Sequence, residues 1–155
     1  MNSPEGDKRW LAVLSTDMEG FTRHSAMLGP ERMYDLLGLV LGYARASIEA
    51  HGGHVVDTAG DGIMATFGAP SALENASLES CRAALSFHER LLRDAPMLEQ
   101  RFGVAPRFRT GIAGGNAMVA HLEDGSIKVV GEPVNAAARL QALANAHEVL
   151  LSENI

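Results

Sequence analysis

Two carboxylates in this sequence stand where a divalent cation could be held. Asp61 lies within Val-Val-Asp-Thr-Ala-Gly-Asp-Gly-Ile-Met-Ala-Thr-Phe (residues 55–67), where an acidic-plus-glycine turn separates two apolar runs. This pattern predicts a β-hairpin with Asp61 at its tip. Asp17 ends the apolar run of residues 11–16, which predicts a strand with Asp17 at its carboxyl end, a common place for chemistry in α/β folds. Carboxylate oxygens on rigid elements suit hard divalent cations such as Mg²⁺.

The residues that follow Asp17 predict a binding place for phosphate. Glu19, Gly20, Phe21 and Thr22 open a helix, so their backbone N–H groups and the helix dipole favour an anion. Two carboxylates on neighbouring strand ends beside a phosphate site indicate two-metal chemistry on a nucleotide. Taken singly, each feature also has a purely structural interpretation, because Asp-Gly is a turn sequence in many proteins.

Three segments together resemble the catalytic domains of class III nucleotide cyclases, the adenylate and guanylate cyclases. They occur in the family's order and spacing, and they read Thr-Asp-Met-Glu-Gly-Phe-Thr (residues 16–22), Ala-Gly-Asp-Gly-Ile-Met-Ala-Thr-Phe (residues 59–67) and Val-Gly-Glu-Pro-Val-Asn-Ala-Ala-Ala-Arg-Leu (residues 130–140). The resemblance covers the chain from about Arg9 to its end. It implies a role in cyclic-nucleotide signalling, in which a ribose 3′-hydroxyl attacks the α-phosphate of a nucleoside triphosphate to give a 3′,5′-cyclic nucleotide and pyrophosphate.

This resemblance assigns metal-binding and catalytic tasks to individual residues. It implies that Asp17 and Asp61 hold two divalent cations, Mg²⁺ or Mn²⁺, with help from the backbone carbonyl of Met18. In the family, one cation helps to form the attacking alkoxide and the other neutralises the triphosphate. The resemblance also implies that Asn135 orients the ribose and that Arg139 stabilises charge on the transferring phosphorus. Their i, i+4 spacing places both on one face of a helix.

Three positions depart from the family pattern, and two of them concern the base. The family's base-reading lysine is Asp57 here, and the second base-reading position, usually Asp or Thr in adenylate cyclases, is Lys128. This reversed polarity predicts a keto base, so GTP or UTP is favoured and GTP slightly preferred; the rival is a salt bridge between the two residues. A lysine that often holds the terminal phosphates is Glu148 here, whereas Arg109 matches a family arginine that contacts the β-phosphate.

The sequence leaves more than one function open. The retained Asp17, Asp61, Asn135 and Arg139 favour an active cyclase. Glu148, and an end earlier than the family's usual further strand and helix, favour a catalytically silent cyclase-homology domain that binds nucleotide or a partner as a regulator. An adenylate cyclase with non-standard base recognition is a further alternative. A diguanylate-cyclase-type domain is disfavoured, since its hairpin tip reads like Gly-Gly-Asp-Glu-Phe.

The resemblance also implies how the protein assembles. In the family, metal-binding residues come from one subunit, and base-reading and transition-state residues come from the other. We therefore expect a head-to-tail homodimer with two shared sites, and an inactive monomer. The helix predicted for residues 31–50 is apolar over much of its circumference, which also favours contact with a partner subunit.

Composition and charge are those of an ordinary globular domain. The 155 residues, 46% of them hydrophobic, suit a single domain at residues 10–155 after a polar lead-in of residues 1–9. The net charge of −6 argues against nucleic acid as a partner. The one cysteine, Cys81, is expected in the core and fits a reducing cytoplasm, and no apolar run is long enough to span a membrane.

Apolar periodicity predicts an α+β domain of the ferredoxin-like, split βαβ type, in which helices flank a central sheet with antiparallel strands, as in the class III cyclase fold. The expected helices are residues 22–28, 31–50, 73–93 and 133–146. The expected strands are residues 10–16, 55–56, 63–67, 107–113, 118–122, 126–130 and 149–151. Gly114-Gly115 is expected to be a turn and the stretch from Pro96 to Pro106 a loop. The buried side of the third helix is expected to carry Ala84, Leu85, Phe87, Leu91 and Leu92.

Overall fold

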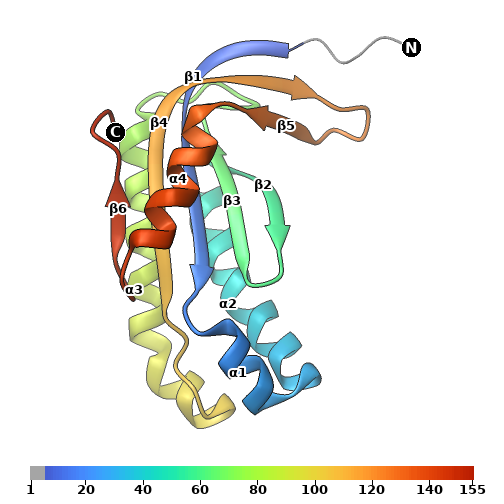
Figure 1. Ribbon diagram of the computed structural model, residues 1–155, viewed down its shortest axis with the longest axis vertical. Helices are drawn as coiled ribbons and strands as arrows, with labels where there is room; N and C mark the ends of the chain where they lie inside the picture. Colours follow the sequence, from blue (N-terminus) through green and yellow to red (C-terminus); the bar gives the residue numbers. More distant parts are fainter. Residues whose placement is uncertain (1–5) are drawn as a thin grey trace.

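The computed structural model describes residues 6–155 and has the predicted α+β architecture, a six-stranded sheet flanked by helices (Figure 1). Five strands follow the order β2-β3-β1-β4-β5, and β6 pairs with β4 in parallel. The elements are β1 (Gly6–Met18), α1 (Phe21–Leu28), α2 (Pro30–Ala50), β2 (His54–Ala59), β3 (Gly62–Phe67), α3 (Ala76–Phe102), β4 (Phe108–His121), β5 (Ile127–Val130), α4 (Glu132–Leu143) and β6 (Val149–Leu151).

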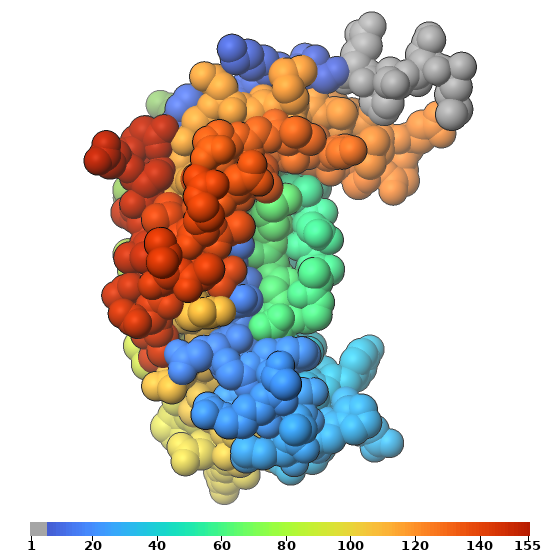
Figure 2. Space-filling view, in the orientation of Figure 1, coloured from blue at the N-terminus to red at the C-terminus, as the bar shows by residue number. Residues whose placement is uncertain are grey.

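The two faces of the sheet are covered unequally. Leu14 and Phe108 belong to the core under α2 and α3, whereas Leu11 and Val13 belong to a second core under α4. Alternate residues of β1 thus enter opposite cores, which explains why its central run is continuously apolar. The single helix α4 packs on β1, β4 and β6, so β2 and β3 lie beside it at the floor of an open concave side (Figure 2).

Gly111 fixes how closely α4 approaches the sheet. A Cβ atom at this position would lie 2.4 Å from the carbonyl oxygen of Ala137 and 2.4 Å from the backbone nitrogen of Gln141. The helix backbone therefore rests directly on β4, because no side chain stands between them. This contact sets the place of α4 and of the two predicted catalytic residues that it carries.

The first strand is longer than the sequence predicted. It begins at Gly6, and its first residues pair with β4 from Gly6↔Ala120 to Arg9↔Ala117. Residues 6–9 are therefore part of the sheet and not a lead-in; the rest of the predicted lead-in, residues 1–5, lies outside the described residues. The apolar pattern did not reveal this extension because backbone pairing holds it, while its side chains point largely to solvent.

Gly114 and Gly115 do not form the predicted turn, and β4 passes through both as one strand. A Cβ on Gly114 would lie 2.7 Å from the Trp10 ring, and one on Gly115 would lie 2.9 Å from Cγ of Pro133. These glycines therefore allow neighbouring side chains to pack against the strand, which a sequence cannot distinguish from a turn requirement.

Helix α3 also differs from its prediction. It continues through Pro96 to Phe102, because Leu98 and Phe102, four residues apart, are both buried and hold the last turns against the core. Leu85 and Leu92 are not on its buried side but are 56% and 55% exposed. The predicted Ala84, Phe87 and Leu91 are buried. Cys81 is partly buried against the same core, and burial raises the pKa of its thiol.

Candidate active site

The folded chain brings Asp17 and Asp61 to one edge of the sheet. Asp17 is the second-last residue of β1 and pairs with Gly62 of β3. Asp61 stands in the tight turn between β2 and β3. A Cβ on Gly62 would lie 3.0 Å from the Thr16 carbonyl oxygen and 3.5 Å from Cβ of Asp17. The glycine after Asp61 therefore lets the hairpin tip approach the end of β1 closely.

A hollow of about 200 Å³ opens between these elements. Its lining includes three acidic residues, Asp17, Asp57 and Asp61, together with Gln141 of α4. Sequence reasoning missed Gln141. Its only signal was a long polar side chain on the otherwise small, apolar inner face of α4, which also carries Ala137.

The charge at the hollow suits a cation. Burial raises the pKa of Asp61, the nearby charge of Asp17 raises it further, and the backbone amides of Asp61 and Met18 act in the opposite direction. A bound cation would relieve both unfavourable effects. Among residues 6–155, no group of three or more His, Cys, Asp or Glu side chains is placed to hold a metal ion. A cation here would therefore take further oxygen ligands from the backbone, water or substrate phosphate.

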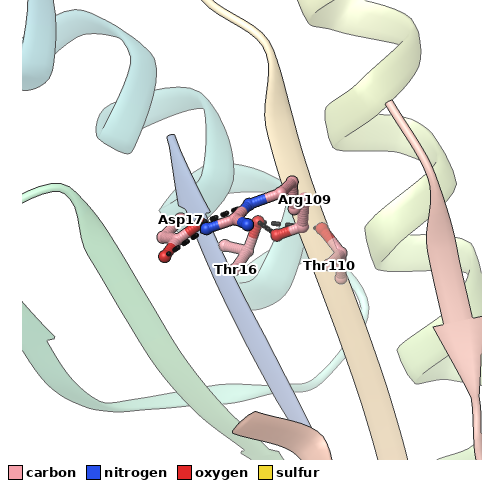
Figure 3. A network of polar contacts seen from close by, with 4 residues as sticks. All are labelled: Thr16, Asp17, Arg109 and Thr110. Atoms are coloured by element: carbon pink, nitrogen blue, oxygen red, sulfur yellow. Dashed lines mark hydrogen bonds and ion pairs between the residues drawn. The ribbon is translucent and has the colours of Figure 1, made fainter. Parts of the chain in front are cut away.

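Arg109 faces Asp17 across the β1–β4 ladder (Figure 3). Its Nη2 donates to Oδ1 of Asp17 over 3.1 Å and its Nε donates to the same oxygen over 3.3 Å. Both side chains are less than one-third exposed, so this charge-assisted pair is partly shielded from water. The predicted phosphate-contacting arginine thus lies at the rim of the carboxylate pair.

Fewer backbone amides are free to bind phosphate at the start of α1 than the sequence predicted. The amide of Glu19 donates to the Arg107 carbonyl oxygen over 2.8 Å, and the two side chains form an ion pair at 3.0 Å. The backbone N–H of Glu19 is therefore not free to bind a phosphate. Gly20 adopts a left-handed conformation before α1 and gives it no side-chain cap. The first-turn amides of Phe21 and Thr22 keep their predicted place at the helix N-terminus.

The other predicted site residues lie away from this hollow. Asn135 and Arg139 are exposed on α4, and the Arg139 guanidinium pairs with Glu132 of the same helix. Lys128 is exposed on β5. No ion pair joins it to Asp57 in the part of the chain from residue 6 onward, so the predicted rival interpretation of these two residues is not observed.

Glu148 has a structural use that accounts for one departure from the family pattern. Its carboxylate accepts a hydrogen bond from the Asn145 backbone nitrogen over 3.1 Å, and its carbonyl oxygen accepts one from Thr110 over 3.1 Å. It therefore holds the connection between α4 and β6 against β4.

Comparison with known proteins identifies the family. The sequence model of the family described as the adenylate and guanylate cyclase catalytic domain matches residues 5–155. The chain belongs to this family. The cyclase domain is similar to two solved structures: the guanylyl cyclase Cya2, at TM-score 0.89 and 26% identity over 96% of this chain and 77% of that one, and the adenylyl cyclase CyaB from P. aeruginosa, at TM-score 0.85 and 27% identity over 97% and 80%.

Curated relatives carry the cyclase domain within longer proteins. An uncharacterized protein of Mycobacterium tuberculosis is 32% identical over 146 residues, and adenylate cyclase 1 of Rhizobium meliloti is 31% identical over 138 residues. The chain spans 26% and 20% of their lengths. None of the helices between residues 6 and 155 combines the length and apolarity that crossing a membrane requires.

Proposed function

We propose that this cyclase domain is catalytically active and converts a nucleoside triphosphate, GTP or UTP in preference to ATP, into its 3′,5′-cyclic nucleotide and pyrophosphate. The observation that carries the proposal is the hollow that Asp17 and Asp61 line together, with Arg109 paired to Asp17. A silent domain would have no need to keep two carboxylates together at an apolar strand end, where the burial of Asp61 is unfavourable.

Asp17, Asp61 and the backbone carbonyl of Met18 would hold two divalent cations, Mg²⁺ or Mn²⁺. When bound, the cations would supply Lewis-acid activation of the ribose hydroxyl and neutralisation of the triphosphate. Arg109 contributes a donor that can turn from Asp17 to a phosphate oxygen, since a planar guanidinium binds carboxylate and phosphate in the same bidentate manner. The amides of Phe21 and Thr22 add uncharged donors at the start of α1.

The remaining site residues are proposed to come from a second copy of the chain. Asn135, Arg139 and Lys128 do not line the hollow of their own chain, and the concave side beside α4 (Figure 2) offers room for a partner over β2 and β3. A head-to-tail homodimer would then hold two sites, each with metal ligands from one subunit and transition-state residues from the other. Arg139 would exchange Glu132 for the transferring phosphate.

Base selection follows from the polarity of Asp57 and Lys128. Adenine and cytosine present a ring acceptor and an amino donor, so both would meet like groups at these positions. Guanine and uracil present an N–H donor beside a keto oxygen and can satisfy both residues. A mismatched buried polar group costs roughly 1–3 kcal/mol, which is enough to select a substrate. GTP is slightly preferred because Asp57 can accept from both N1 and the 2-amino group.

The test is a product assay with ATP, GTP, CTP and UTP in Mn²⁺, with the products separated by chromatography and the dimer confirmed beforehand. We expect cyclic GMP or cyclic UMP as the main product. A preference for ATP would contradict the base argument and support an adenylate cyclase with non-standard base recognition, the activity named in the Rhizobium meliloti relative. Absence of any cyclic product from a folded dimer would support the silent domain, which Glu148 favours.

A further inference from the structure

Three buried side chains form a chain of hydrogen bonds next to the Asp17–Arg109 pair, on the opposite face of the sheet. His88 of α3 contacts Thr110 through Nε2 over 2.8 Å, and the hydroxyl oxygens of Thr110 and Thr16 are 2.8 Å apart. The Thr16 hydroxyl donates to the Arg109 carbonyl oxygen over 3.0 Å. His88, Thr16 and Thr110 are all at least 95% buried, with exposures of 5%, 2% and 0%.

The hydrogens of this chain can be arranged in one way only. The hydrogen of Thr16 goes to the Arg109 carbonyl, so the contact between the two threonines requires the hydrogen of Thr110. The contact between Thr110 and His88 then requires a hydrogen on Nε2 of His88. All three hydrogen bonds therefore run in the same direction, from His88 toward Arg109. Consecutive hydrogen bonds of this kind strengthen one another in a dry protein interior.

The protonation state of the His88 ring agrees with this arrangement of hydrogens. A hydrogen on Nε2 leaves Nδ1 of the neutral ring as a bare acceptor, and Nδ1 is buried with no hydrogen-bond partner among residues 6–155. Burial, helped by the nearby His147, lowers the pKa of His88 to about 4. The ring is thus neutral at neutral pH.

The location of the chain suggests its purpose. Thr16 and Thr110 form the register pair next to Asp17 and Arg109, and only one further pair closes the β1–β4 ladder at this end. Because successive residues of a strand point to opposite faces, the threonines face α3 while the ion pair faces the hollow. Ladder ends open most readily, so a cross-strand link at this point holds the ion pair in register (Figure 3).

We propose that His88 is a positioning residue for the metal-binding edge of the sheet, acting through Thr110 and Thr16 to hold β1 and β4 in the register that aligns Asp17 with Arg109. This inference rests on the proposed function, because it takes Asp17 to be a metal ligand. Groups that orient metal ligands typically influence metal affinity by roughly 10–100-fold.

The test is Mn²⁺ binding to the full chain without nucleotide, measured by electron paramagnetic resonance of the free ion. Thr110→Val keeps the shape of the side chain and removes the hydroxyl, and His88→Leu removes the donor. We expect each to raise the Mn²⁺ dissociation constant roughly tenfold. His88→Gln can place an amide nitrogen near the former Nε2, so it should restore binding to within about threefold of the wild type.

Thr66→Val is the matched control. Thr66 is a fully buried threonine of β3 whose hydroxyl donates to the Ala69 carbonyl oxygen over 2.8 Å. This hydrogen bond is separate from those that join His88, Thr110 and Thr16. It should lose a comparable buried hydrogen bond and leave Mn²⁺ affinity unchanged. Thermal unfolding of each variant verifies that only folded proteins are compared. If His88→Leu does not fold, the Mn²⁺ affinity of Thr110→Val alone decides the test.

Three outcomes would overturn the inference. Wild-type affinity in Thr110→Val would show that the chain does not position the site, and an equal loss in Thr66→Val would show that any buried hydrogen bond has this effect. Either leaves the proposed function intact. A folded wild-type protein that binds no Mn²⁺ at millimolar concentration would instead overturn the proposed function, and this inference with it.

Discussion

Asp17 and Arg109 on the sheet are held very differently from Asn135 and Arg139 on α4. The first pair is 27% and 29% exposed and lies on paired strands. The hydrogen-bonded, buried Thr16 and Thr110 lie next to it in the same two strands. Arg139 is 63% exposed and forms an ion pair with Glu132 of its own helix. The sheet-borne half of the proposed site is thus positioned within one chain, whereas the helix-borne half would acquire its surroundings from the second subunit of the proposed dimer.

The largest expected effect comes from the sheet-borne half. Asp17→Asn should lower cyclase activity by about 10³-fold or more, because it removes a charged metal ligand. It should also weaken Mn²⁺ binding without unfolding the protein, since Asp17 fills no core. Activity and Mn²⁺ titration are the measurements, and Asp7→Asn, an exposed carboxylate on the same strand, is the control. Wild-type activity in Asp17→Asn would remove the two-metal interpretation.

The helix-borne half should behave differently. Arg139→Ala should lower kcat by roughly 10²–10³-fold, since it removes a group that stabilises developing charge. Mn²⁺ affinity and thermal stability should stay at wild-type values because the side chain is largely exposed and does not line the hollow of the carboxylates. A matching loss of Mn²⁺ affinity would show that the two halves are not separate.

Exchange of the two proposed base-reading residues tests the specificity of the site. Asp57→Lys combined with Lys128→Asp should shift preference from GTP toward ATP by roughly 10–100-fold, the equivalent of one or two mismatched polar groups. The ratio of kcat/KM for the two nucleotides is the measurement. An unchanged ratio would show that these residues do not read the base.

Much of the fold could be predicted because local patterns were unambiguous. The apolar run before Asp17, the Asp-Gly turn and the long α2 all form as expected. The errors arose where one residue type serves two purposes. Gly114 could signal a turn or a close approach, and only the position of Trp10 decides for the latter. Leu85 fitted a helical repeat but faces solvent, because periodicity does not say which side of an apolar helix is covered.

The site could be predicted in part for a similar reason. Asp17 and Asp61 stand in short motifs, so a sequence reveals them. The hydrogen bonds among His88, Thr110 and Thr16 join residues 22 and 94 positions apart, and nothing local marks any of them. Such supporting contacts depend on which helix crosses beneath which strand, so only the folded chain reveals them.

The smallest effect concerns pH and separates the buried support from the exposed half. His88 has a pKa of about 4 in the folded protein against an ordinary 6.5, so protonation favours the unfolded chain and stability falls as pH drops below 6.5. The loss between pH 7.5 and pH 5 should be roughly 2 kcal/mol from this residue. His24 and His147, whose pKa values are also lowered, should add in the same direction. Urea unfolding of wild type and His88→Gln measures the difference, and an equal loss in both would contradict it.

The most direct test of a divided site is complementation between two inactive chains. Asp17→Asn lacks the sheet-borne half and Arg139→Ala lacks the helix-borne half, so a mixed dimer would contain one intact site. Random mixing of equal amounts makes half of all dimers mixed, and activity should recover to about a quarter of wild type. Recovery to that level, with mixed dimers demonstrated by differently tagged chains, is the predicted result. Mixed dimers that remain as inactive as their parents would contradict the account.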